Sequence, residues 1–302
     1  MIATNGNTRL WRHKSVRALI RSAGGGDPVE IIRSKCKEVV AWAKSLGWKG
    51  PPFDPLTLAS LRGIRAREST GLFSAEAQLT PMDGQQLLLE FNPDRAPGRR
   101  NYSISHELIH TFFDDCFEMV HQRKSGRAAF DPQQEVEYLC QVGAAEILMP
   151  EEDFALDLER LGLSLSGISE LCQLYEASRE AVARRMLALT DEAAALVFFS
   201  HRLKPVEKKN GGYLTSQERK ERMRILYSVQ TPTFPVFLPA HKSVPDESCV
   251  NAAIFTDEVA SGYENWGVRD SGRWFVEAMA LPVPTAADET SASVVALVLP
   301  HK

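Results

Sequence analysis

Long apolar runs are absent from the sequence, and no secretory signal opens it, so we expect neither a membrane-spanning protein nor an exported one. Cysteine is scarce: the five residues, at positions 36, 116, 140, 172 and 249, are odd in number and form no Cys-x-x-Cys pair. This indicates reduced thiols in the cytoplasm and gives no cysteine a metal-binding role. A charge excess is also missing, because 35 basic and 39 acidic residues leave a net charge of −4. That balance argues weakly against nucleic acid as the main partner.

The most informative feature present is the run His106-Glu107-Leu108-Ile109-His110. On an α-helix, residues four apart are offset by only about 40° around the axis and about 6 Å along it, so both imidazoles can reach one metal ion. Zinc accepts imidazole nitrogen, lowers the pKa of a bound water to about 7 and works with a neighbouring carboxylate that removes the proton. The motif therefore predicts a hydrolytic metal site. The alternative is a chance pair of histidines on an amphipathic helix.

The surroundings of the motif favour a rigid, buried helix. We expect a loop at Pro97-Gly98 and a helix start near Ser103 or Ser105. Apolar residues on the other side of the helix would hold the ligands in place: Ile104, Leu108, Ile109, Phe112 and Phe113.

A catalytic metal needs a third protein ligand, and the candidates lie in a second predicted helix, residues 133–149, which Pro150 ends. Glu137 shares its stripe with Cys140, Ala144 and Leu148, so its carboxylate points toward the apolar face and needs a compensating partner there. A metal ion would supply that compensation; a buried arginine or a backbone cap is the alternative. Glu135 and Glu146 are expected to face water.

His106-Glu107-x-x-His110, followed 31 positions later by Glu137 within EYLCQVGAAEILMPE, resembles the ImmA/IrrE family of bacterial metallopeptidases. The resemblance implies His106, His110 and Glu137 as metal ligands and Glu107 as general base. It also implies zinc as the metal, with manganese or another divalent ion as the alternative. Many family members have Gly before the second histidine, where this chain has Ile109; that position is expected to face away from the metal.

The rest of the chain predicts an α+β, multidomain architecture. A basic tail (1–26) with a mobile stretch or a short helix precedes a zincin-like metallopeptidase domain (27–152). Helix-turn-helix segments (153–195) and a GAF-like α/β domain (196–302) follow; the GAF-like assignment comes from the resemblance, by order and size. A mobile linker is expected near 204–220, where residues 202–224 carry eight basic and three acidic residues.

Local patterns place the elements within these domains. Asp27-Pro28-Val29-Glu30 has the form of a capping box that opens a helix, and residues 54–62 suggest another. The strands of a small sheet are expected at 76–79 and 87–91, joined at Asp83-Gly84. Two helices joined near Ala177-Ser178 are expected between Ile168 and Thr190. Four strands are expected near the end of the chain, at 223–229, 234–238, 273–281 and 293–299.

We therefore expect a cytoplasmic metalloprotease. The resemblance implies that its substrate is a helix-turn-helix (XRE-type) repressor, whose cleavage would derepress stress-response or mobile-element genes. Residues 168–190 are neutral in charge, so DNA binding is expected to be weak or absent. The alternatives are a DNA-binding activator with a structural metal site and an anti-repressor that binds its partner without cutting it. Tyr102 and His121 are candidates for stabilising the oxyanion. The sequence gives no oligomeric state.

Overall fold

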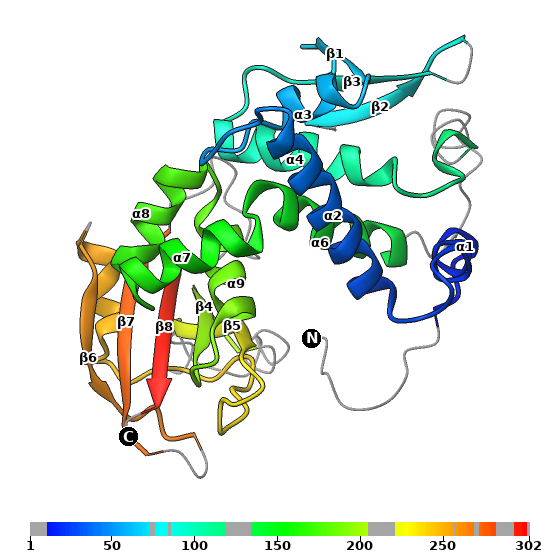
Figure 1. Ribbon diagram of the computed structural model, residues 1–302. Helices are drawn as coiled ribbons and strands as arrows, with labels where there is room; N and C mark the ends of the chain where they lie inside the picture. Colours follow the sequence, from blue (N-terminus) through cyan, green and yellow to red (C-terminus); the bar gives the residue numbers. More distant parts are fainter. Residues whose placement is uncertain are drawn as a thin grey trace, which may run out of the picture. The chain divides into compact units, whose positions relative to one another are not determined.

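The computed structural model describes residues 11–72, 76–83, 86–118, 134–204, 221–256, 258–268, 272–281 and 293–300 (Figure 1). Contacts divide the chain into two compact units. The N-terminal unit contains the described residues from 11 to 160 and Glu170–Val182, and the C-terminal unit contains Leu161–Ser169 and the described residues from 183 to 300. Each combines helices with one sheet, which confirms the predicted α+β class with more than one domain. No described helix is both long enough and apolar enough to cross a membrane.

The N-terminal unit is mainly helical. Its helices are α1 (Lys14–Ser22), α2 (Pro28–Ser45), α3 (Pro55–Leu61), α4 (Pro97–His110), α6 (Gln134–Leu148) and α7 (Glu151–Leu161), the last ending in the C-terminal unit. Its strands are β1 (Arg65–Glu68), β2 (Ala77–Pro81) and β3 (Leu87–Phe91). Helix α6 packs against both α2 and α4, so it lies in the interior of this unit. The predicted mobile linker and the turn at Gly84 fall largely outside the described residues.

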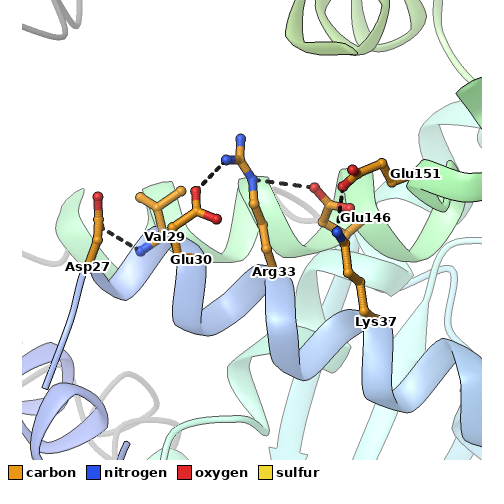
Figure 2. Close-up of polar contacts among 7 residues, drawn as sticks. All are labelled: Asp27, Val29, Glu30, Arg33, Lys37, Glu146 and Glu151. Carbon is orange, nitrogen blue, oxygen red and sulfur yellow. Dashed lines mark hydrogen bonds and ion pairs between the residues drawn. The ribbon is translucent and has the colours of Figure 1, made fainter. Parts of the chain in front are cut away.

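Helix α2 begins where the capping pattern predicts. The Asp27 carboxylate accepts a hydrogen bond from the Val29 amide at 3.0 Å, and Pro28 is the first helical residue. Glu30, the second residue of the predicted capping box, makes a different contact: its carboxylate binds Arg33 at 2.6 Å (Figure 2). The helix start is therefore fixed by Asp27 and Pro28.

A row of ion pairs then connects α2 to α6 and α7 (Figure 2). Arg33 Nε lies 3.5 Å from Glu146, Lys37 lies 2.8 Å from Glu151, and Lys44 lies 2.5 Å from Asp153. The pairs to α7 are partly exposed and contribute little each. The Arg33 pair differs from these, because its carboxylate, that of Glu146, is buried, and breaking an ion pair to a buried charge costs more than breaking one at the surface.

Gly143 of α6 allows α4 to approach closely. A Cβ atom at position 143 would lie 2.7 Å from Cγ1 and 2.8 Å from Cδ1 of Ile109, whose side chain is buried. Ile109 thus packs away from the motif's histidines and into the space that the glycine leaves.

We expect Gly143→Ala to lower the free energy of unfolding by about 1–3 kcal/mol, because the added methyl group overpacks the interface between α4 and α6. Urea denaturation measures the change. Gly71→Ala is the matched control, because a Cβ there meets no described atom within 4 Å. An unchanged urea midpoint for Gly143→Ala would show that the two helices can separate without cost.

The small sheet has the strand order β1-β3-β2, with β1 parallel and β2 antiparallel to the central β3. The predicted strand pair is present, and β1 was not predicted. Glu90 of β3 binds Arg67 of β1 at 2.6 Å and Gln78 and Thr80 of β2 at 3.1 and 2.6 Å. These bonds cross-link all three strands on one face of the sheet.

The hydrogen bonds from Thr80 and Arg67 lower the pKa of Glu90 from 4.5 to about 2. Because the folded-state pKa is depressed, this carboxylate contributes stability above pH 4.5 that is lost as the pH falls toward 2. We expect Glu90→Gln to reduce the free energy of unfolding at neutral pH by up to about 3 kcal/mol. The difference from the wild type should disappear near pH 2. Urea titrations at several pH values measure this stability difference. A difference that does not change with pH would show that ionisation of Glu90 is not its cause.

The C-terminal unit contains a five-stranded antiparallel sheet of order β5-β4-β8-β7-β6 (Figure 1). The strands are β4 (Ala195–Arg202), β5 (Arg222–Gln230), β6 (Ala260–Glu264), β7 (Trp274–Ala280) and β8 (Val294–Pro300), accompanied by helix α11 (Cys249–Ala252) and the 3-10 turn η2 (Ala253–Phe255). One face of the sheet carries a core that includes Trp266 and Trp274. The GAF-like assignment stays a prediction.

Three of the four strands predicted near the end of the chain are present, as β5, β7 and β8. The prediction of a strand at Phe234–Leu238 is wrong, because this segment is irregular. Prolines at positions 232, 235 and 239 lack the amide hydrogen that a sheet ladder requires.

Two helices, α8 (Leu165–Tyr175) and α9 (Arg179–Leu189), occupy the predicted helix-turn-helix segment. Ser178 caps α9 through a 3.2 Å bond from the Ala181 amide, as its position predicted. Five of the eleven residues of α9 are buried, and its exposed residues are Glu180, Arg184 and Ala188. A helix that reads DNA bases needs an exposed polar face. The exposed surface of α9 offers one charge of each sign, and weak or absent DNA binding by the two helices stays a prediction.

Candidate metal centre and active site

Helix α4 carries the His-Glu-x-x-His motif at its C-terminal end. The helix begins at Pro97, so the predicted start at Ser103 or Ser105, after a loop at Pro97-Gly98, is wrong. Proline suits the first helical position, since its φ is already helical and its missing amide hydrogen would have no partner there. Gly98 is needed in this first turn, because a Cβ there would lie 2.8 Å from the Glu176 carbonyl oxygen. The motif is thus held at the end of a 14-residue helix.

The structure brings the three predicted ligands together. Nε2 of His106 lies 3.0 Å from one carboxylate oxygen of Glu137 on α6, and Nε2 of His110 lies 3.7 Å from the other. The exposed fraction of the side chain falls from 34% for Glu137 to 16% for His106 and 2% for His110. The three side chains therefore meet at the border of the buried interior, with Glu137 open to solvent. Their role as metal ligands is a proposal.

The other glutamates of α6 correct an expectation, because Glu135 and Glu146 are buried instead of facing water. The Glu135 carboxylate accepts hydrogen bonds from the Arg12 amide, at 2.9 and 3.1 Å to its two oxygens, and from the His13 amide at 2.9 Å. Glu146 pairs with Arg33, as described above. Both carboxylates are thus satisfied by elements distant in sequence, and Glu135 ties the start of α6 to the start of α1.

Cys140 contacts the other ring nitrogen of His110, Nδ1. Its Sγ is 3.4 Å from Nδ1 of His110, and ligand atoms of Cys140, His106 and His110 all lie within 4.8 Å of one another. These three residues could therefore hold an ion without Glu137. We favour the Glu137 set, because Cys140 is fully buried and a catalytic metal needs an open position for water. In the favoured set, Cys140 instead orients the His110 ring so that Nε2 faces Glu137.

Glu107 points toward the small sheet. Its carboxylate accepts a hydrogen bond from the Leu79 amide of β2 at 3.2 Å, and its side chain is largely buried. In the antiparallel ladder between β2 and β3, every second residue pair is joined by backbone hydrogen bonds. Leu79 and Leu89 form one of the pairs between these, so the Leu79 amide points away from β3. Sequence reasoning missed this contact. Pro81 was the available signal, since a proline within a strand indicates a sheet edge.

Of the two candidates for stabilising the oxyanion, only Tyr102 lies among the described residues. Its ring centroid is 6.5 Å from that of His106, one turn along α4. His121 falls outside the described residues. Tyr102 therefore stays a candidate on proximity alone.

Two imidazoles, a carboxylate and an adjacent glutamate are the groups used by metal-dependent peptidases of the His-Glu-x-x-His class. Comparison with known proteins agrees: residues 67–187 match the IrrE N-terminal-like domain family, peptidase M78. The resemblance to the ImmA/IrrE metallopeptidases is thus confirmed for this segment, which contains the motif and Glu137.

Curated relatives match the chain over a similar length. The radiation response metalloprotease IrrE of Deinococcus radiodurans is 30% identical over 121 residues, which cover 39% of this chain and 35% of that protein. The protein of the same name from Deinococcus deserti is 27% identical over 121 residues, covering 39% of this chain and 41% of that protein. The match thus spans less than half the length of either relative.

A solved structure is similar over most of the chain. A Mycobacterium tuberculosis transcriptional regulator superposes with a TM-score of 0.57 at 14% identity, covering 95% of this chain and 80% of that chain. At this identity the similarity concerns the fold.

Proposed function

We propose that this chain is a metal-dependent endopeptidase that cleaves a helix-turn-helix (XRE-type) transcriptional repressor and thereby derepresses stress-response or mobile-element genes. The observation that carries the proposal is the meeting of His106, His110 and Glu137 through imidazole Nε2 and carboxylate atoms, with Glu107 next to His106 on the same helix. The relatives' printed name, radiation response metalloprotease, supports the class of activity. The repressor as substrate rests on the family resemblance.

A divalent metal fits this donor set, with zinc first and manganese or another divalent ion as the alternative. Two imidazoles and one carboxylate match the ligands of catalytic zinc sites, and the solvent-open side of Glu137 leaves room for water and substrate. The bound metal would polarise the scissile carbonyl and make a water molecule more acidic. His106, His110 and Glu137 would hold it, and Cys140 would keep His110 in the required orientation.

Glu107 is the proposed general base. One of its carboxylate oxygens accepts the Leu79 amide hydrogen bond, which fixes the side chain. The carboxylate would take a proton from the attacking water and return it to the leaving amine. Tyr102 is the candidate for stabilising the oxyanion, by its proximity to His106.

The outer edge of β2 is the proposed binding surface for an extended substrate segment. Strand β2 lies at the edge of its sheet, and Leu79 of this strand contacts the proposed base directly. A peptide that adds to this edge would bring its backbone beside Glu107. A segment unfolded from the repressor, rather than its folded helices, is therefore the expected substrate.

A cytoplasmic location is part of this proposal. All five cysteines are free, which suits a reducing compartment. DNA binding is expected to be weak, because the exposed surface of α9 carries one arginine and one glutamate.

The test is to incubate the purified chain, loaded with zinc or manganese, with the repressor encoded by a neighbouring gene, and to follow cleavage by gel electrophoresis and mass spectrometry. We expect two defined fragments from the wild type, none after chelation, and recovery when metal is restored. An intact repressor held in a stable complex would favour the non-cleaving anti-repressor. Tight binding to one promoter at physiological salt, with no cleavage, would favour the DNA-binding activator.

A further inference from the structure

A group of basic side chains in the C-terminal unit is separate from the proposed active site. Ser200 and Arg202 are two residues apart on β4, and Arg224 of β5 lies directly opposite Ser200. The segment after Pro239 runs along the outer edge of β5, where the His241 amide donates to the Ile225 carbonyl at 2.8 Å. The sheet thus places two arginines and one histidine side by side. We call Ser200, Arg202, Arg224 and His241 the basic cluster.

The basic cluster is held in a fixed geometry by its own hydrogen bonds. Arg224 Nε donates to the Arg202 carbonyl at 3.0 Å, and Arg224 Nη1 donates to the His241 carbonyl at 3.3 Å. Arg202 Nη2 lies 3.3 Å from the Ile225 carbonyl and 2.9 Å from Nδ1 of His241. Since a guanidinium can only donate, His241 accepts at Nδ1 and carries its proton on Nε2. The Nε2 hydrogen is then a further donor.

Two buried atoms of the cluster make no hydrogen bond to any residue that the structure describes. They are Nε of Arg202 and Oγ of Ser200. A buried donor without a partner is costly, so such atoms commonly mark the place of a water, an ion or a ligand. Both belong to one face of β4, because residues two apart in a strand point the same way.

Two members of the cluster, Arg202 and His241, also make no ion pair with a carboxylate among the described residues. Glu221 pairs with the exposed His201 instead. Burial, and then the charges of Arg202 and Arg224, lower the pKa of His241. The field at this place therefore opposes a further positive charge and favours an anion.

We propose that the basic cluster binds a small phosphate-class oxyanion, either inorganic phosphate or the phosphate group of a small metabolite. Arg202 would contact it through its guanidinium, whose planar donors suit phosphate oxygens. His241 would donate from Nε2, and Ser200 would donate its hydroxyl hydrogen. Arg224 shapes the site through the two carbonyls that it binds. The site would make the C-terminal unit responsive to a phosphorylated small molecule, independently of any peptidase activity.

The test is calorimetric titration of the full chain with inorganic phosphate and, separately, with phenyl phosphate at low ionic strength. We expect saturable binding of one anion per chain, weakened about 10- to 100-fold by Arg202→Gln, because a charge-assisted donor is lost. Ser200→Ala should weaken it less, and the control Arg273→Gln should leave it unchanged, because Arg273 instead binds the Tyr263 carbonyl on β6. Tighter binding of phenyl phosphate than of phosphate would identify a metabolite as the ligand, and the reverse would identify the free ion.

Folding of each variant is checked by circular dichroism and thermal melting. If Arg202→Gln does not fold, Arg202→Lys and His241→Gln replace it, and each should weaken binding in the same way. No saturable binding by the wild type would overturn the proposal, as would equal affinity in the wild type and the folded cluster variants.

Discussion

Glu107→Gln is expected to lower the rate of repressor cleavage by a factor of about 10²–10⁴ or more, with metal content unchanged. Glutamine has nearly the same size, and its side-chain oxygen can still accept the Leu79 amide hydrogen bond, so the local structure should be kept. It cannot take a proton from water, which removes the step assigned to Glu107. Single-turnover cleavage assays, with metal analysis of the same samples, measure both quantities.

Glu152→Gln is the matched control for this variant. Glu152 lies exposed on α7 and should tolerate the same exchange without effect on cleavage or metal. Cleavage by Glu107→Gln at the wild-type rate would refute the assignment of the base. A parallel loss of metal and activity would instead assign Glu107 a role in holding the ion.

Removal of a metal ligand should have the second large effect. His106→Ala, His110→Ala and Glu137→Gln are each expected to lower the metal content of the dialysed protein well below that of the wild type, because two remaining ligands hold a metal weakly. Mass spectrometry of bound metal and competition with a chelator dye measure the loss. An amide oxygen can still coordinate, so Glu137→Gln should lose less than the histidine variants.

Cys140→Ala separates the two candidate ligand sets. If Glu137 completes the site, the Cys140→Ala variant keeps most of its metal. Its affinity for the metal falls by at most roughly 10–100-fold, which is the loss typical of a residue that only orients a ligand. Full metal in Glu137→Gln with none in Cys140→Ala would assign the ion to Cys140. Glu152→Gln again serves as control, since the buried Glu135 and Glu146 hold other elements in place and would confuse the result.

The proximity of the two histidines could be predicted because His106 and His110 share one helix. Their approach to Glu137 agrees with the family resemblance, but helical periodicity did not select this glutamate, because Glu137 is the most exposed of the three glutamates on α6. The environment of Glu135 and Glu146 could not be predicted in this way. Helical periodicity separates the faces of one helix, but it does not reveal that α1 and α2 cover the polar side of α6.

The same limit appears in the C-terminal sheet. The alternation Met223, Ile225, Tyr227, Val229 predicted a strand correctly, but the register with β4 shifts between Phe198 and Phe199. The irregularity places Tyr227 opposite Phe198 while Ile225 stays opposite Phe199. A shift of this kind depends on the partner strand, so the sequence pattern alone could not locate it.

The hydrogen bond between Leu79 and Glu107 has a consequence for the solubility of the protein. An open sheet edge is a template on which other chains can assemble. On the outer side of β2, Glu107 occupies the Leu79 amide, and Pro81 has no amide hydrogen to offer. The outer edge of β2 thus offers backbone carbonyl acceptors but few free amide donors. Aggregation through a sheet edge requires a continuous ladder of both, so pairing between copies of the protein is disfavoured, while a single extended peptide can still bind there.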